Sequence, residues 1–202
     1  MRTIVIAMTA LLAGCASLSE DGGFDAVRGA TKERAAGEAR WIRTEKDAQA
    51  ARGRVKELLG APLTADSAVE VALLNNRGLQ AAYAELGIAE ADLVQAGRLR
   101  NPGFSIGRSR RGNEVEVEWS LMFDVLGLVT MPWRTGVERQ RFSGVQVEAA
   151  AETLRIGGEA RRAYFRAVAA AEAERYAVQV NEAAGAGAEL ARRMAAAGNF
   201  SR

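Results

Sequence analysis

The chain has 202 residues, with 27 basic and 25 acidic side chains and a formal net charge of +2. This balance argues against nucleic-acid binding, which normally shows a one-sided basic excess. The absence of histidine and the single cysteine exclude a histidine-based catalytic triad, a histidine-containing zinc site and an internal disulfide. We expect no enzyme and no metal or cofactor site, because no nucleophile lies beside a base. The three prolines, Pro62, Pro102 and Pro132, fall between alanine-rich segments, so long helices are expected.

Residues 1–15 are typical of a secretory signal peptide. Arg2 gives a positive start, and residues 4–14 form a mostly apolar run of 11 residues, too short to span a bilayer. The run ends LAGC, which resembles a bacterial lipobox and implies lipid attachment and acylation at Cys15. An ordinary signal peptide with an accidental cysteine is the alternative. By resemblance to lipoprotein sorting, Ala16 favours the outer membrane over the inner one.

Residues 16–62 are polar and charge-mixed, and we interpret them as a tether followed by surface helices that strap onto a larger body. A first strong helix is predicted over residues 64–100, with Thr64 as its N-cap and a seam of alternating leucine and alanine. A long helix is predicted over residues 133–197, with Pro132 at its first turn. Its apolar residues recur at spacings of three and four, as in a coiled coil.

A β-hairpin is predicted between the two helical segments, over residues 103–124, with its turn near Gly112. Apolar and polar residues alternate in its second strand, which predicts one apolar face and one charged face. The apolar residues are Val115, Val117, Trp119, Leu121 and Phe123, and the carboxylates on the other face are Glu114, Glu116 and Glu118. Such a strand suits an outer-membrane barrel, and a half-buried hairpin in a soluble domain is the alternative. The fold class expected is mainly α, with long coiled-coil-like helices and a small β-hairpin between them.

Several stretches of residues 63–202 resemble the TolC-type outer-membrane efflux family, and the lipobox resembles its lipoprotein branch, which serves drug or heavy-metal efflux. These stretches are residues 63–76, 79–82, 89–97, the Asn101-Pro102 pair and residues 190–199. The resemblance implies half of an outer-membrane α/β-barrel protomer. It also implies a homotrimer in the outer membrane of a Gram-negative bacterium, with a periplasmic helical part. Drugs or metal ions would leave passively through the tube, which would dock onto a periplasmic adaptor protein and an inner-membrane pump.

In that assignment the five apolar hairpin residues face lipid and the three carboxylates face the lumen. Family members contain two repeats of helix, strand pair and helix, whereas this sequence supplies one and ends at Arg202. We therefore expect a truncated chain or a fragment. The alternative is a non-channel structural or adaptor lipoprotein built on a coiled-coil hairpin.

Overall fold

The computed structural model describes residues 18–34 and 37–199. It is 70% helical, with one two-stranded antiparallel sheet, which confirms the mainly α fold class with a small hairpin. In chain order the elements are α2 (Phe24–Thr31), α3 (Glu45–Leu59), α4 (Ala65–Asn75), α5 (Arg77–Ala96), β1 (Gly103–Arg111), β2 (Glu114–Met122) and α6 (Val125–Ala196). Cys15, the predicted site of lipid attachment, lies outside the described residues.

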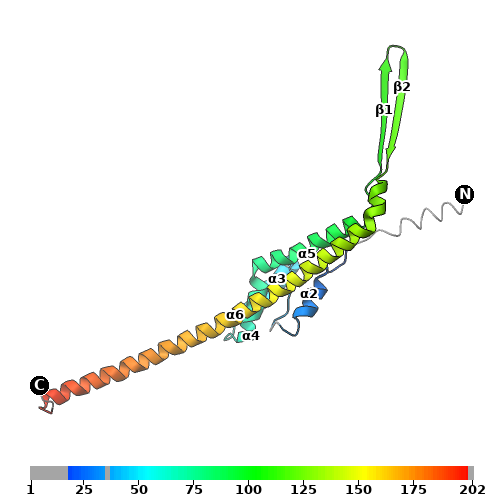
Figure 1. Cartoon of the computed structure of the whole chain (residues 1–202). Helices are drawn as coiled ribbons and strands as arrows, with labels where there is room; N and C mark the ends of the chain where they lie inside the picture. Colours follow the sequence, from blue (N-terminus) through cyan, green and yellow to red (C-terminus); the bar gives the residue numbers. More distant parts are fainter. Residues whose placement is uncertain (1–17, 35–36, 200–202) are drawn as a thin grey trace.

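The molecule is elongated along α6, which has 72 residues and is about 108 Å long. Figure 1 shows the hairpin projecting from one end and the C-terminal end of α6 at the other. Helices α2 to α5 gather around the part of α6 that is nearer the hairpin. Because α5 leads into the hairpin and α6 leads out of it, the two helices lie antiparallel and side by side.

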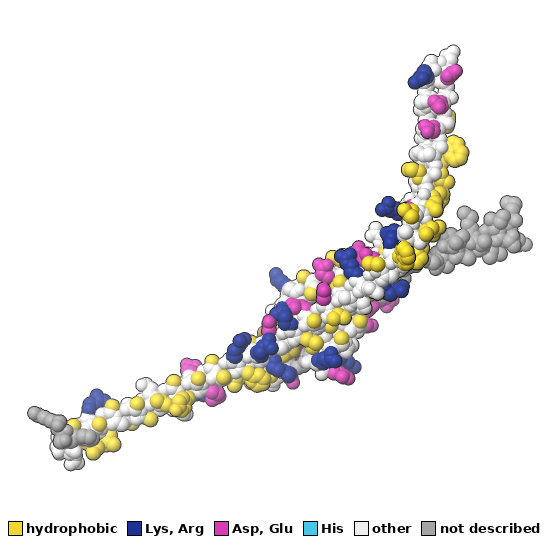
Figure 2. Space-filling view, viewed as in Figure 1, with side chains coloured by type: hydrophobic (Ala, Val, Ile, Leu, Met, Phe, Trp, Pro, Cys, Tyr) yellow, Lys and Arg dark blue, Asp and Glu magenta, His cyan; other side chains and the backbone are white. Residues whose placement is uncertain are grey.

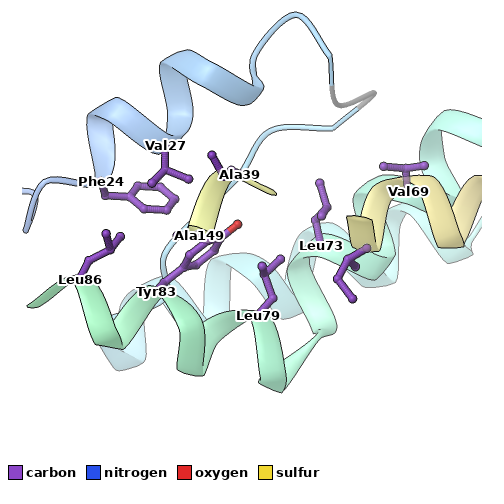
Figure 3. Packing of buried hydrophobic residues seen from close by; sticks show 11 residues of the cluster. Phe24, Val27, Ala39, Val69, Leu73, Leu79, Tyr83, Leu86 and Ala149 are labelled. Carbon is purple, nitrogen blue, oxygen red and sulfur yellow. The ribbon is translucent and has the colours of Figure 1, made fainter. Parts of the chain in front are cut away.

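The core lies where α2, α4 and α5 meet the middle of α6 (Figure 3). Tyr83 of α5 is fully buried, and the ring of Phe24 from α2 packs edge-on against it at a centroid distance of 4.8 Å. The Tyr83 hydroxyl lies 2.7 Å from Oγ1 of Thr153 in α6. The Thr153 hydroxyl in turn donates to the Ala149 carbonyl at 2.8 Å, so Tyr83 is the donor of the bond that joins α5 to α6. Burial raises the pKa of the Tyr83 phenol, so it stays protonated at neutral pH.

Helix α3 is held to α4 by an ion pair with two hydrogen bonds. Arg54 donates from Nε and Nη2 to the two carboxylate oxygens of Glu70, at 2.7 and 3.0 Å. The hydrogen bonds from Arg54 lower the pKa of Glu70 below its ordinary value. This contact fastens the segment before residue 62 to the first strong helix.

The predicted helix over residues 64–100 is wrong in its continuity, because it is two helices with a break at Asn76. Thr64 caps α4 as predicted, accepting a hydrogen bond from the Ser67 N–H. Asn76 is extended, with φ −79° and ψ 108°, and its side chain accepts from the Leu79 N–H at 2.9 Å. An asparagine side chain that binds the backbone in this way competes with a continuous helix. The second helix ends at Ala96 rather than at residue 100.

The predicted start of the long helix at residue 133 is also wrong. Helix α6 begins at Val125, where the Asp124 side chain accepts from the Gly127 N–H at 2.7 Å. Pro132 therefore lies inside the helix, where it cannot donate a backbone hydrogen bond. Figure 1 shows α6 bending near this end, between the hairpin and the straight part of the helix, and proline is a usual cause of such a bend.

The far part of α6, residues 165–196, extends beyond the other described helices (Figure 1). The buried residues of α6 end at Gly157, and most large apolar side chains beyond it are exposed. They include Phe165, Tyr176, Val180 and Leu190, which belong to the apolar seam that the spacing of three and four predicts along this helix. We call residues 165–196 the distal arm. Within the part of the chain that the structure describes, no second helix covers its seam.

Candidate membrane interface

The hairpin is built around a two-residue turn at Gly112 and Asn113. Gly112 has φ +62°, and the described chain has no other residue type with positive φ. A positive φ at the first central position only is the pattern of a type II′ turn, which matches the twist of two paired strands. The turn fixes the register, so Arg111 pairs with Glu114 and Gly103 pairs with Met122.

Residues that pair across an antiparallel hairpin lie on the same face. Near its base, the apolar face holds two fully apolar pairs, Phe104 with Leu121 and Ile106 with Trp119. These side chains are exposed, and Trp119 is 70% exposed. Figure 2 shows hydrophobic side chains over this half of the hairpin and charged side chains over the half near the turn.

The expectation of a fully apolar face is wrong for the half of the hairpin near the turn. Val117 pairs with Arg108 and Val115 pairs with Arg110, so both arginines lie on the face that carries the valines. Phe123 follows the last strand residue, Met122, and belongs to the exposed connection into α6. Long arginine side chains can direct their charged ends away from an apolar surface, toward water. The face is therefore apolar at its base and mixed near the turn.

The opposite face is polar along most of its length. Glu114 pairs with Arg111, Glu116 with Ser109, and Glu118 with Gly107. All three carboxylates are exposed. Closer to the base, Ser105 and Ser120 pair through their hydroxyl oxygens at 2.7 Å. The three predicted lumen-facing residues thus share a face that carries small or polar partners.

Exposed apolar side chains continue from the base of the hairpin into the first turns of α6. Those of α6 are Val125, Leu126, Leu128, Val129, Trp133 and Val137. Figure 2 shows this surface where the hairpin joins the helices. A continuous apolar surface of this kind on an exposed element marks contact with a membrane or another protein.

A groove of about 1030 Å³ lies beside this surface, between the end of α5 and the beginning of α6. We call it the neck groove. Its lining includes Arg98, Leu99, Arg100, Trp133, Arg134 and Arg141. Leu18 also lines it, and the next residue, Ser19, donates its N–H to the Glu90 carboxylate at 2.8 Å. The N-terminal segment therefore reaches the helices at the neck groove.

Sequence reasoning missed several residues of this surface. It left out Phe104 and Ile106 of β1, although their alternation, read in register from the turn at Gly112, places them with Leu121 and Trp119. It also left out the neck groove, because Arg100 and Arg134 come to line one groove only through the packing of α5 against α6. No signal in the local sequence reports that approach.

The described residues hold no group of three or more histidine, cysteine, aspartate or glutamate side chains placed to bind a metal ion. Among the helices in residues 18–34 and 37–199, none is both long enough and apolar enough to cross a membrane. In comparisons with known proteins, no family model, curated protein or solved structure matches this chain.

Proposed function

We propose that this protein is the outer-membrane channel component of a tripartite efflux system. In this proposal it exports drugs or metal ions passively through a trimeric tube and docks onto a periplasmic adaptor protein and an inner-membrane pump. The observation that carries the proposal is the exposed hairpin between two helical segments, apolar at its base on one face and polar on the other. The family, the trimer and the partners rest on the sequence resemblance.

The dimensions of the hairpin support the proposal. Each strand has nine residues, and a strand that crosses a bilayer needs about 9–11. The apolar pairs at the base would lie in lipid, and Arg108 and Arg110 would reach the far headgroups. Glu114, Glu116 and Glu118 would then line a water-filled lumen.

The free edges of the hairpin favour an oligomer. β1 and β2 pair only with each other in the described sheet, so each has an outer edge of unpaired backbone groups. Unpaired backbone groups in lipid cost several kcal/mol each, by general estimate, so neighbouring strands must close the sheet. Three hairpins give six strands, and usual membrane barrels have at least eight, so the proposal requires further strands in each subunit.

The proposed mechanism is conduction without chemistry. A solute would pass along the polar face of the hairpins and between the helices, and energy would come from the pump. The carboxylates of the lumen face would attract cations, and this attraction would weaken as salt screens it. Across the hairpin, Glu114 lies opposite Arg111, whereas Glu116 lies opposite Ser109 and Glu118 opposite Gly107. Glu116 and Glu118 therefore have no basic residue directly opposite them.

The test is an arginine substitution on either face of the hairpin. Ile106→Arg places a charge on the apolar face, opposite Trp119 and next to the Phe104–Leu121 pair, and should cost about 2–4 kcal/mol near the middle of a bilayer. Ser109→Arg, the matched control, places it on the polar face opposite Glu116. The measurement is trypsin cleavage at Arg108, Arg110 and Arg111 in isolated outer membranes, detected by peptide mass. We expect wild type and Ser109→Arg to be protected and Ile106→Arg to be cleaved.

A structural or adaptor lipoprotein is the second candidate, favoured by the mixed half of the apolar face and by the exposed distal arm. In that case the hairpin lies outside the membrane. Trypsin should then cleave the wild-type hairpin as readily as the Ile106→Arg hairpin. This outcome would rule out the channel.

A further inference from the structure

The neck groove combines positive charge with an apolar wall. Arg98, Arg100, Arg134 and Arg141 line it, against the carboxylates of Asp92 and Glu138. Arginine predominates among the charged residues there, although the whole chain is nearly balanced. The groove is therefore a local concentration of positive charge, suited to an anionic group.

Arg100 and Arg134 are the arginines of the groove best placed to bind an anion. Arg100 is 80% exposed in its side chain and its nearest carboxylate, Asp124, is 3.9 Å away, at the limit of an ion pair. No carboxylate in residues 18–34 and 37–199 forms an ion pair with Arg134. Arg141 lies near two carboxylates, 3.7 Å from Glu138 and 4.0 Å from Asp92, so it faces more negative charge than Arg100 or Arg134 does.

The apolar wall of the groove includes one aromatic side chain, Trp133. Trp133 is adjacent to Arg134 in sequence and is 83% exposed, and Leu99 beside Arg100 is also exposed. Exposed tryptophan next to arginine is typical of the boundary between lipid and water, where the ring meets the acyl chains and the cation meets the phosphates. A soluble anion would use the arginines but would leave Trp133 and Leu99 exposed to water.

The path of the chain leads to the same place. Leu18 lines the groove, and three residues of chain span at most about 11 Å. An acyl group on the predicted attachment site, Cys15, would therefore enter lipid close to the groove. The apolar base of the hairpin adjoins the groove from the other side.

From these observations we infer that the neck groove binds the phosphate of an anionic phospholipid at the membrane surface. Arg100 and Arg134 donate to the phosphate oxygens, and Trp133 and Leu99 pack against the adjoining acyl chains. Guanidinium groups suit this role because they donate two parallel hydrogen bonds to a phosphate. The inference rests on the proposed function insofar as that proposal places the hairpin in lipid.

The test uses the full chain reconstituted in phosphatidylcholine vesicles, with tryptophan fluorescence quenched by brominated lipid. The variant Trp41→Phe/Trp119→Phe keeps Trp133 as the reporter of the groove. Brominated phosphatidylglycerol and brominated phosphatidylcholine are compared at equal mole fraction. Each arginine near a membrane surface favours anionic lipid by about 1 kcal/mol, so two arginines predict about 25-fold selectivity at Trp133.

Two double substitutions separate the groove from general charge. Arg100→Gln/Arg134→Gln should reduce the selectivity to near one. Arg162→Gln/Arg166→Gln removes the same charge from exposed positions of α6 away from the groove and should leave it unchanged. Equal quenching of Trp133 by both lipids, or equal loss in both variants, would overturn the inference. So would loss of selectivity on adding inorganic phosphate at matched ionic strength, because that result would assign the groove to a soluble anion.

A second reporter distinguishes failure of this inference from failure of the channel proposal. The variant Trp41→Phe/Trp133→Phe keeps Trp119 in the hairpin. If brominated lipid quenches Trp119 and not Trp133, the hairpin lies in lipid and the inference about the groove is wrong. If it quenches neither residue, both proposals are wrong.

Discussion

The hydrogen bond between Tyr83 and Thr153 should show an asymmetric cost when each partner is removed. Tyr83→Phe removes the donor and leaves the Thr153 hydroxyl bound to the Ala149 carbonyl. The expected loss is about 1 kcal/mol, the usual net value of a neutral hydrogen bond. Thr153→Val instead leaves a buried phenol O–H without its acceptor, which costs about 2 kcal/mol.

The double variant Tyr83→Phe/Thr153→Val should lose about 1 kcal/mol, less than the sum of the single losses, because it leaves no unsatisfied donor. The assay is urea unfolding of the full chain, followed by the fluorescence of Trp41, which packs against the core cluster. The midpoint and slope of each transition give the free energy of unfolding. Additive losses, or a Thr153→Val loss no larger than that of Tyr83→Phe, would refute the assignment of donor and acceptor.

Three further predictions concern other parts of the fold. Because Arg54 lowers the pKa of Glu70, their contact stabilises the fold above the ordinary pKa of 4.5, and this stabilisation is lost as pH falls through the lower folded pKa. The urea midpoint of Arg54→Gln should therefore fall less between neutral and acid pH than the wild-type midpoint does. An equal fall in both proteins would contradict this. Gly23→Ala should destabilise the fold by about 2 kcal/mol or more, because φ is +74° and the new Cβ would lie 2.2 Å from Phe142 Cζ. The control Gly29→Ala, in open space on α2, should be neutral or stabilising. Thermal unfolding of both variants measures the difference. In hydrogen exchange measured by mass spectrometry, amides of the distal arm should exchange faster than those of residues 145–158, because core contacts protect only the latter. Equal protection of both segments would show that the arm is covered.

Much of the fold follows from local sequence signals. Alanine-rich segments separated by prolines predict the helices, and the alternation of polar and apolar residues over 114–121 predicts a strand. Thr64 and Asp124 both cap helices. The sequence predicts the first cap, but Pro132 favours a later start of the long helix than the one that Asp124 provides. A proline eight positions into a helix is tolerated there because the bend it causes occurs at the exposed end of α6, outside the core.

The parts that local signals do not predict depend on contacts between elements. Asn76 ends α4 and caps α5 through the Leu79 N–H, and this break allows α4 to pack on both α3 and α6. To predict that the face is mixed near the turn, the register of both strands must be known, because only the pairing places Arg108 opposite Val117. The neck groove forms only because the end of α5 at Ala96 and the start of α6 at Val125 come together, and about 30 residues separate them in the sequence.

The bend near the hairpin end of α6, the part that holds Pro132, makes the rest of the helix a long rigid arm. About 95 Å of straight helix lies beyond it, at 1.5 Å per residue, and the hairpin lies on the short side. A rotation of one degree at the bend would displace the far tip by roughly 1.7 Å, and a rotation of five degrees would displace it by roughly 8 Å. A contact that fixes the orientation of the hairpin end therefore also fixes the position of the opposite tip. Small changes in the backbone torsion angles of one helical turn near the bend would move that tip by the length of a side chain.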